Sequence, residues 1–294
     1  MNLIVDGLLS LVTRIFSIIG LTRARALSRW VARTRLVTSS RAAEITETNV
    51  GLCFPHYTPE QRKQLAQESL AETACLLGEL GIISRWPESR RLAITPDRIP
   101  ILEEALESKR GVLILAPHFG NWEFLGLYLG QLGLMALYNQ PTNKFLERAL
   151  LKIREHSSVR LEPLTFAGLR TARTHLGKGG CLGMLPDQVP RRAAGVYAPF
   201  FGIDSLTMTL AHRLIQSTNP IVLIGIAKRV PSGFELRFSK PEDGLYSASA
   251  TLSAESMNRS IEELILVDPA QYQWEYKRFR RQPQGSDCLY AHLG

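Results

Sequence analysis

Apolar and polar positions follow two different rhythms along the chain, and the change comes near residue 111. Before it, apolar residues recur at helical spacing between prolines, which predicts helices over residues 44–54, 59–83 and 101–109. Three prolines within residues 85–100 indicate an irregular connection or an edge element there.

After residue 111, short apolar runs alternate with segments of helical length. The expected strands cover residues 111–116, 134–138, 159–164, 181–185 and 220–227, with an edge strand over 234–239. The expected helices cover residues 122–132, 144–156, 167–177, 206–217 and 251–266. Strands that alternate with helices predict an α/β fold with a mixed, largely parallel sheet flanked by helices.

The N-terminal segment has a pattern of its own. Residues 3–21 are strongly apolar, but Asp6, Ser10, Arg14 and Ser17 recur at spacings of three and four, along one face of a helix. A charge at the centre of a membrane-spanning helix costs on the order of 3 kcal/mol. An amphipathic, membrane-associating helix is therefore favoured over a spanning one.

A basic stretch follows this apolar segment. It contains arginines and no acidic residue: Arg23, Arg25, Arg29, Arg33, Arg35 and Arg41. Cationic side chains beside an apolar helix are attracted to anionic lipids and are retained on the cytoplasmic side. We expect residues 1–40 to form a membrane anchor and residues 41–294 to form the catalytic domain. The alternative is a core helix followed by a solvated basic face.

Composition narrows the classes of partner. The 294 residues carry a formal net charge of +8, which suits an acidic protein or a phospholipid surface. No zinc finger or basic region with heptads is present, so nucleic acid is not an expected partner. The four cysteines are scattered without metal-ligand spacing, and we expect neither a metal site nor a disulfide framework.

The segment from His118 to Glu123 carries the candidate chemistry, because it lies where an expected strand passes into a helix. On a continuous helix the two side chains would point about 140° apart, so the chain must bend between them. Gly120 permits that bend, and Asn121 is a good N-cap for a helix beginning at Trp122. A carboxylate beside an imidazole fixes its tautomer and stabilises the imidazolium. His118 would then deprotonate a hydroxyl, with Glu123 as its partner. A lone histidine after a buried strand is also commonly structural.

Further blocks of the chain resemble a known family. The span from His118 to Glu123 is similar to the His-x-x-x-x-acid motif of glycerolipid acyltransferases. More specifically, the chain resembles the lipid A late acyltransferases, the lauroyl and myristoyl transferases of Gram-negative bacteria. The other blocks that carry this resemblance are residues 47–55, Pro186–Gln188 with Ala198–Gly202, and Pro269–Trp274 with Lys277–Phe279 and Gln282–Pro283.

The resemblance implies an enzyme at the cytoplasmic face of the inner membrane, with a fold like that of the glycerolipid acyltransferases. It would move a fatty acyl group from acyl carrier protein to a hydroxyacyl chain of a lipid A precursor. The acyl carrier protein thioester is the donor substrate, and no cofactor is expected. His118 would be the base and Glu123 its partner.

Other residues are candidates for binding substrate. Arg154 would hold a phosphate or the oxyanion of the thioester, since a guanidinium suits both. Asp187 would organise the pocket or bind a sugar hydroxyl, although a plain turn carboxylate is an equal interpretation. The other substrate-binding candidates are Asn121, Tyr138, Asn143 and Gln188.

Two alternatives to this function stay open. One is acyl transfer to another membrane lipid. The other is a non-catalytic, membrane-bound lipid-binding protein, which would require the His118–Glu123 pair to be vestigial.

Overall fold

The computed structural model describes residues 16, 18–83, 93–94, 99–138 and 158–293. Its centre is a seven-stranded sheet with the order β1-β9-β8-β2-β5-β3-β4. Neighbouring strands are parallel except β8 and β9, which are antiparallel, so the expected mixed, largely parallel sheet is confirmed. The strands are β1 (Ala93–Ile94), β2 (Val112–Leu115), β3 (Leu134–Tyr138), β4 (Arg160–Pro163), β5 (Cys181–Met184), β8 (Ile221–Val230) and β9 (Gly233–Ser239).

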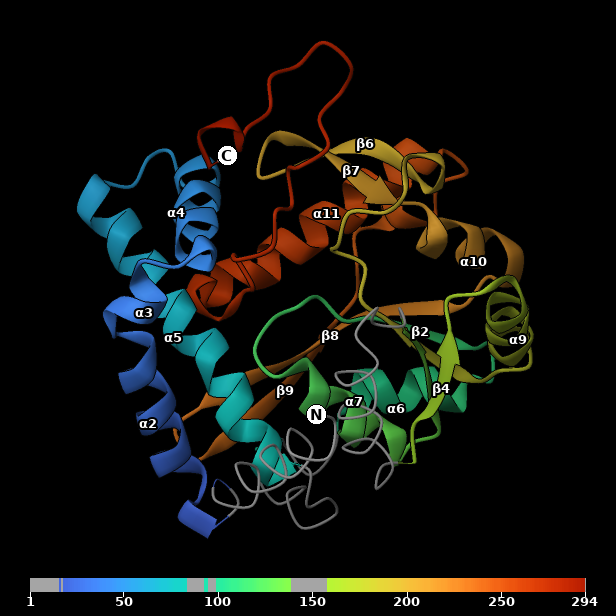
Figure 1. Ribbon diagram of the computed structural model, residues 1–294. Helices are drawn as coiled ribbons and strands as arrows, with labels where there is room; N and C mark the ends of the chain where they lie inside the picture. The colour runs from blue at the N-terminus through green and yellow to red at the C-terminus, as the bar shows by residue number, and fades with distance from the viewer. Residues whose placement is uncertain (1–15, 17, 84–92, 95–98, 139–157, 294) are drawn as a thin grey trace, which may run out of the picture.

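Helices cover both faces of the sheet, as Figure 1 shows. Helices α6 (Pro100–Glu107) and α7 (Trp122–Gly130) pack on one face. The opposite face is covered by α4 (Arg41–Cys53), α9 (Phe166–Gly177), α10 (Leu210–Thr218) and α11 (Ala250–Val267). The long helix α5 (Pro59–Ile83) contributes side chains to both clusters, and α2 (Leu21–Ala32) packs against it; α3 (Arg35–Thr38) joins α2 to α4.

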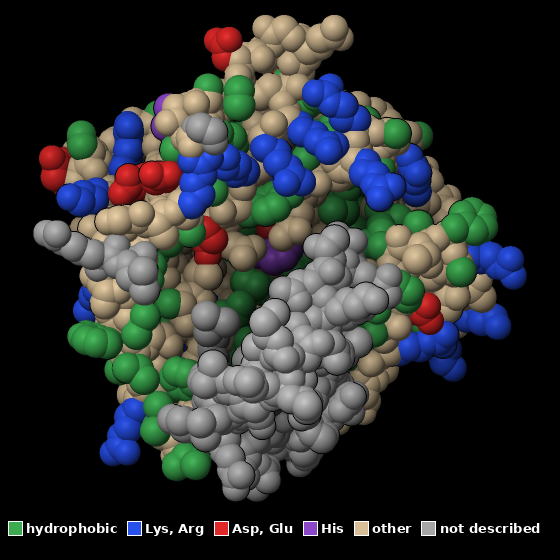
Figure 2. Space-filling view, in the orientation of Figure 1, with side chains coloured by type: hydrophobic (Ala, Val, Ile, Leu, Met, Phe, Trp, Pro, Cys, Tyr) green, Lys and Arg blue, Asp and Glu red, His purple; other side chains and the backbone are tan. Residues whose placement is uncertain are grey.

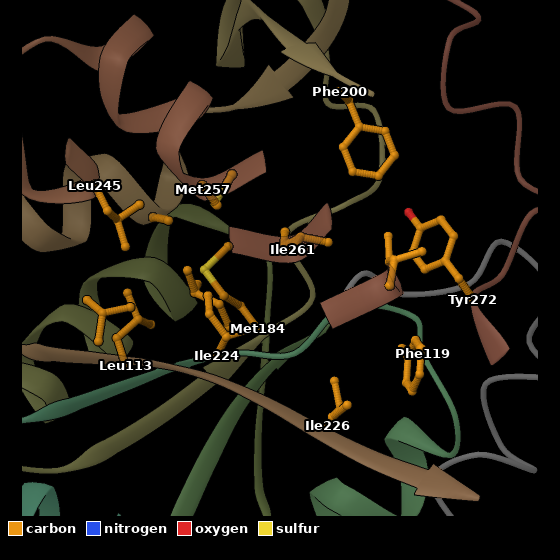
Figure 3. Close-up of a cluster of buried hydrophobic side chains, with 14 of the residues drawn as sticks. Leu113, Phe119, Met184, Phe200, Ile224, Ile226, Leu245, Met257, Ile261 and Tyr272 are labelled. Carbon is orange, nitrogen blue, oxygen red and sulfur yellow. The ribbon is translucent and has the colours of Figure 1, made fainter. Parts of the chain in front are cut away.

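The central strands are buried on both sides, which explains their continuous apolar runs. In β2, Leu113 and Leu115 face the cluster that contains α11, whereas Val112 and Ile114 face α6 and α7. Figure 3 shows Leu113 and neighbouring strand residues below Met257 and Ile261 of α11. The sheet is thus the middle layer of a three-layer structure.

Two expectations from the sequence were wrong. Residues 206–208 were expected in a helix, but they end the strand β7 (Ile203–Met208), which forms an antiparallel hairpin with β6 (Gly195–Phe200). Phe201 and Gly202, both at positive φ, form the two-residue turn of this hairpin. Because β7 pairs with β6 as far as Met208, the helix α10 begins only at Leu210. Strand β9 is not an edge strand, because β1 pairs with it on the outer side.

The described part of the N-terminal segment is folded onto the body of the protein. Within the described residues, no helix is long and apolar enough to cross a membrane. Arg25 of α2 is 2% exposed, so the expectation that it contacts lipid was wrong. The boundary at residue 40 and the membrane association stay predictions. Most of residues 3–21 and the expected helix over 144–156 lie outside the described residues.

Candidate functional site

The loop between β2 and α7 is held at the carboxyl edge of the sheet. Gly120 has φ +58°, and a Cβ atom there would lie 2.1 Å from the carbonyl oxygen of Ala227. Its backbone N–H donates to the carbonyl of Gln271 at 2.9 Å, and the N–H of Asn121 donates to Ala227 at 2.9 Å. The predicted bend at Gly120 is confirmed, and only glycine fits it without strain.

A second strand end brings Asp187 to His118. In the parallel pair of β2 and β5, Leu115 is in register with Met184, and each is followed three residues later by one of the two side chains. Asp187 Oδ1 lies 2.7 Å from Nδ1 of His118, and its Oδ2 accepts the backbone N–H of His118 at 2.9 Å. One carboxylate therefore fixes both the ring and the backbone of the histidine.

The contacts of His118 define a single neutral tautomer. With the proton on Nδ1 donated to Asp187, Nε2 becomes the acceptor, and the Gln188 side-chain nitrogen lies 3.2 Å from it. The imidazole packs edge-on against Trp122, with 5.0 Å between ring centroids. Nε2 is the nitrogen that can receive a proton from a substrate, since Nδ1 is held by the carboxylate.

Asp187 is charged although it is buried. Burial alone would raise the pKa of Asp187, but the charge of protonated His118 and hydrogen bonds to its ring and backbone lower that pKa below its ordinary value. Burial, together with the charge of Asp187, raises the pKa of Tyr272 well above the usual range, so this phenol stays neutral. The charged carboxylate of Asp187 therefore lies directly beside the His118 ring, and the neutral Tyr272 phenol adds no second charge.

Glu123 lies in the first turn of α7, with Asn121 as the N-cap, as the sequence predicted. Its side chain is nearly buried and borders a cavity. The contact with a ring nitrogen of His118 that was expected from Glu123 is made by Asp187. A catalytic role for Glu123 stays a prediction.

The cavity beside Glu123 is apolar and lies between α7 and the sheet. Counted with its open mouth, it encloses about 630 Å³. Trp122 and Glu123 border it close to His118, and Tyr138 also lines it. Its other walls include Ile114, Leu125, Gly126, Leu129, Leu134, Ala136, Val159, Leu161 and Gly183. This lining is apolar and suits an alkyl group.

Figure 2 shows a hollow on this face, with a histidine side chain at its floor and apolar side chains around it. Lys and Arg side chains stand along the upper rim in the same view. The loop after β5 is fastened near this site by the C-terminal segment. The backbone N–H of Val189 donates to the Tyr276 hydroxyl at 2.9 Å, and Arg281 donates to the carbonyl of Pro190 at 2.8 Å.

The remaining predicted residues fall into three groups. The side chain of Asn121 is buried and bonded to protein atoms, so its capping role is confirmed and a substrate contact stays a prediction. Gln188 and Tyr138 lie at the site, the first beside His118 and the second in the cavity wall. Asn143 and Arg154 lie outside the described residues.

The C-terminal aromatic and basic residues dock the chain onto its core. Trp274 and Phe279 are buried, and Arg278 donates to the carbonyl of Leu206 and the hydroxyl of Thr207, at 2.9 Å each. Arg278 is 3% exposed, so its guanidinium belongs to the core.

We next compared the chain with known protein families. A family model described as bacterial lipid A biosynthesis acyltransferase matches residues 4–281, which is nearly the whole chain. The chain belongs to the bacterial lipid A biosynthesis acyltransferase family.

Curated relatives of this acyltransferase differ in the acyl group that their names carry. The lipid A biosynthesis palmitoleoyltransferase of Escherichia coli K12 is 29% identical over 255 residues, covering 85% of this chain and 82% of its own. The lauroyltransferase of the same organism is 26% identical, covering 85% and 83%. The myristoyltransferase is 23% identical, covering 85% and 78%. The family is shared, whereas the donor chain varies within it.

The partner role of Asp187 was missed in the sequence. The signal for it was a carboxylate three residues past a buried strand, at the same offset as His118 past its own strand. Glu275 was missed as well. Burial raises the pKa of Glu275, while a hydrogen bond from Thr73 and the charges of His118 and Arg229 act to lower it, so Glu275 is a further carboxyl group near the site, in addition to Asp187 and Glu123.

A pair of glycine substitutions tests the loop geometry. We expect Gly120→Ala to lower the melting temperature and to reduce activity, because a methyl group meets the Ala227 carbonyl and φ is positive. Gly51→Ala is the control, since a Cβ there meets nothing within 4 Å inside α4, and alanine stabilises a helix by about 1 kcal/mol relative to glycine. Equal melting temperatures for both variants would contradict the proposed constraint at Gly120.

Proposed function

We propose that this acyltransferase moves a fatty acyl group from acyl carrier protein to a hydroxyacyl chain of a lipid A precursor, at the cytoplasmic face of the inner membrane. The observation that carries the proposal is the His118–Asp187 pair beside an apolar cavity. Family membership and the names of the relatives support lipid A as the acceptor class. The net charge of +8 is complementary to an acidic carrier protein and a phosphorylated lipid.

In the proposed reaction, Nε2 of His118 takes the proton from the acceptor hydroxyl as its oxygen attacks the thioester carbonyl. This attack forms the new C–O bond and a tetrahedral intermediate, and the C–S bond breaks when that intermediate collapses. The imidazolium then returns the proton to the departing thiolate. Asp187 holds Nδ1–H and stabilises the imidazolium between these steps. Gln188, which lies 3.2 Å from Nε2, would give up its place there to the acceptor hydroxyl.

Glu123 is proposed to act on substrate. Glu123 borders the cavity, so with an acyl chain bound there its side chain would lie near the thioester end. Glu123 lies in the first turn of α7, one residue after the start of the helix. A carboxylate there would orient the polar part of the donor or acceptor, while Asp187 orients the base.

The membrane side of the proposal is supported by α2. Leu27, Trp30 and Val31 lie on one face of this helix and are 42%, 65% and 40% exposed. Such a strip beside arginines is suited to the interface of an anionic bilayer. A membrane-bound enzyme would meet its lipid acceptor in the plane where that lipid resides.

Substitutions at the base and its partner test the chemistry. We expect His118→Ala and Glu123→Ala to abolish transfer, and Asp187→Asn to lower kcat by roughly 10²–10⁴-fold, because the amide keeps the shape and loses the charge. The measurement is transfer from a panel of acyl carrier protein thioesters to defined lipid A precursors. The exposed Asp204→Asn serves as the matched control. Retained activity in His118→Ala would refute the mechanism; transfer only to another lipid would refute the acceptor.

Chain-length selection can be tested at Gly126. This glycine of α7 lines the cavity and a Cβ there meets nothing within 4 Å, so a larger side chain would extend into the space for the donor. We expect Gly126→Leu to lower kcat/KM for long acyl donors more than for short ones. The check is competition between two donors in one assay. Equal losses for all chain lengths would show that the cavity does not hold the acyl chain.

Vesicle binding tests the membrane face of α2. We expect Trp30→Ser with Val31→Ser to reduce co-sedimentation of the full-length protein with anionic vesicles, because apolar surface is removed from the interface. Leu252→Ser with Leu266→Ser on α11 is the control, since these residues are also exposed, at 42% and 57%. Equal binding by both pairs would exclude α2 as a membrane contact.

A further inference from the structure

A buried cluster of charges connects the N-terminal helix to the catalytic loop. Its centre is Glu79 of α5, which has no exposed surface. The carboxylate accepts hydrogen bonds from Nε of Arg25 at 2.6 Å, from Nε of Arg229 at 2.9 Å and from Nδ2 of Asn121 at 2.8 Å. These donors belong to α2, β8 and the loop that carries His118. One carboxylate thus joins three segments that are far apart in the sequence.

Arg25 is fixed on its other side as well. Its Nη1 and Nη2 donate to the carbonyls of Val230 and Gly233, at 2.5 and 3.0 Å, at the turn between β8 and β9. Its guanidinium lies 4.9 Å from the centre of the Phe234 ring. A planar guanidinium with this many partners is an oriented contact that lysine would not reproduce. Arg25 therefore fastens α2 to the sheet.

Asn121 connects the cluster to the catalytic groups. Its Oδ1 accepts the N–H of Phe124 at 2.8 Å and so caps α7, while its Nδ2 donates to Glu79. His118 lies three residues before it and Glu123 lies two residues after it. The orientation of the Asn121 side chain therefore affects where the side chains of His118 and Glu123 point.

The contact between α2 and α5 leaves little room for movement beside Glu79. A Cβ atom at Gly78 would lie 2.5 Å from Oγ of Ser28 and 3.2 Å from the carbonyl oxygen of Ala24. The helices approach as closely as glycine allows, one residue from the buried carboxylate. A shift of α2 would therefore be transmitted to Glu79.

We propose that Arg25 and Glu79 are positioning residues for acyl transfer, and that α2 supports the catalytic loop in addition to any contact with the membrane. The path runs from Arg25 through the Glu79 carboxylate to Asn121, and from there to His118. This inference rests on the proposed acyl transfer reaction. It gives the N-terminal segment a part in catalysis that a simple anchor does not have.

Two substitutions interrupt this path at its ends. Asn121→Ser keeps an oxygen that can cap α7 but removes the amide Nδ2 that donates to Glu79, and the shorter hydroxyl does not extend as far. Arg25→Met keeps much of the volume but removes the donors from α2. We expect each to lower kcat by about 10–100-fold with little change in KM, because small misplacements of catalytic groups have effects of this size. The control is Arg173→Met, an exposed arginine on α9.

The readouts separate positioning from folding and from attachment. Transfer by full-length protein in mixed micelles gives kcat and KM, and the melting temperature and vesicle co-sedimentation are measured on the same samples. If the two residues act along one path, the double variant Arg25→Met/Asn121→Ser should lose no more than the more affected single variant. If the fold-loss in kcat of the double variant instead equals the product of the two single-variant losses, the two residues act independently and the single path is overturned.

Other outcomes also decide the matter. A wild-type kcat in Asn121→Ser overturns the proposal, whatever Arg25→Met does, because loss in Arg25→Met alone would reflect folding or attachment. Should Arg25→Met fail to fold, Asn121→Ser remains decisive. Absence of transfer in the wild-type protein would instead refute the proposed reaction, so the two failures are distinguishable.

Discussion

The hydrogen bond between Asp187 and His118 depends on β2 and β5 being adjacent parallel strands in one register. Parallel neighbours lie about 4.8 Å apart, and residues at equal distances past paired positions emerge side by side. Because Leu115 is opposite Met184, a three-residue extension of each strand brings the carboxylate to the imidazole. The apolar runs that bury these strands thereby also set the geometry of the proposed base.

The same edge of the sheet fastens the rest of the loop. Strand β8 lies on the other side of β2, and its Ala227 carbonyl accepts the N–H of Asn121 where Gly120 passes closest. Gln271 links the loop to β8 again, accepting from Gly120 through its backbone and bonding to Arg229 through its side chain. The loop is held from two neighbouring strands and the C-terminal segment, so His118 needs little reorganisation before reaction.

Several elements of the fold and of the site were predicted from the sequence, and the contacts that were missed have physical causes. Periodicity located β2, α7 and α5, and Gly120 with Asn121 predicted the bend and the cap. Glu123 was predicted as the partner of His118 from the bend at Gly120 and from the spacing of the His-x-x-x-x-acid motif. The actual contact to Asp187 depends on strand order, which periodicity does not contain. The β6–β7 hairpin was missed for a similar reason, because its pairing is decided by a turn with two residues at positive φ.

The buried cluster around Glu79 poses an energetic question. Removing ions from water costs several kcal/mol for each, and apolar residues of similar volume often stabilise a fold at least as well. Arg25, Glu79 and Arg229 are each no more than 5% exposed, so stability alone does not account for charged side chains at these positions. What oriented charges provide, and apolar packing does not, is a fixed direction for each hydrogen bond. The Asn121 side chain receives such a direction from Glu79, and the loop with His118 is built on that residue. The free-energy cost of burying these charges is then offset by accurate placement of His118 beside the cavity. Because Arg25 of α2 is one of the buried charges, this agrees with a role for α2 in catalysis.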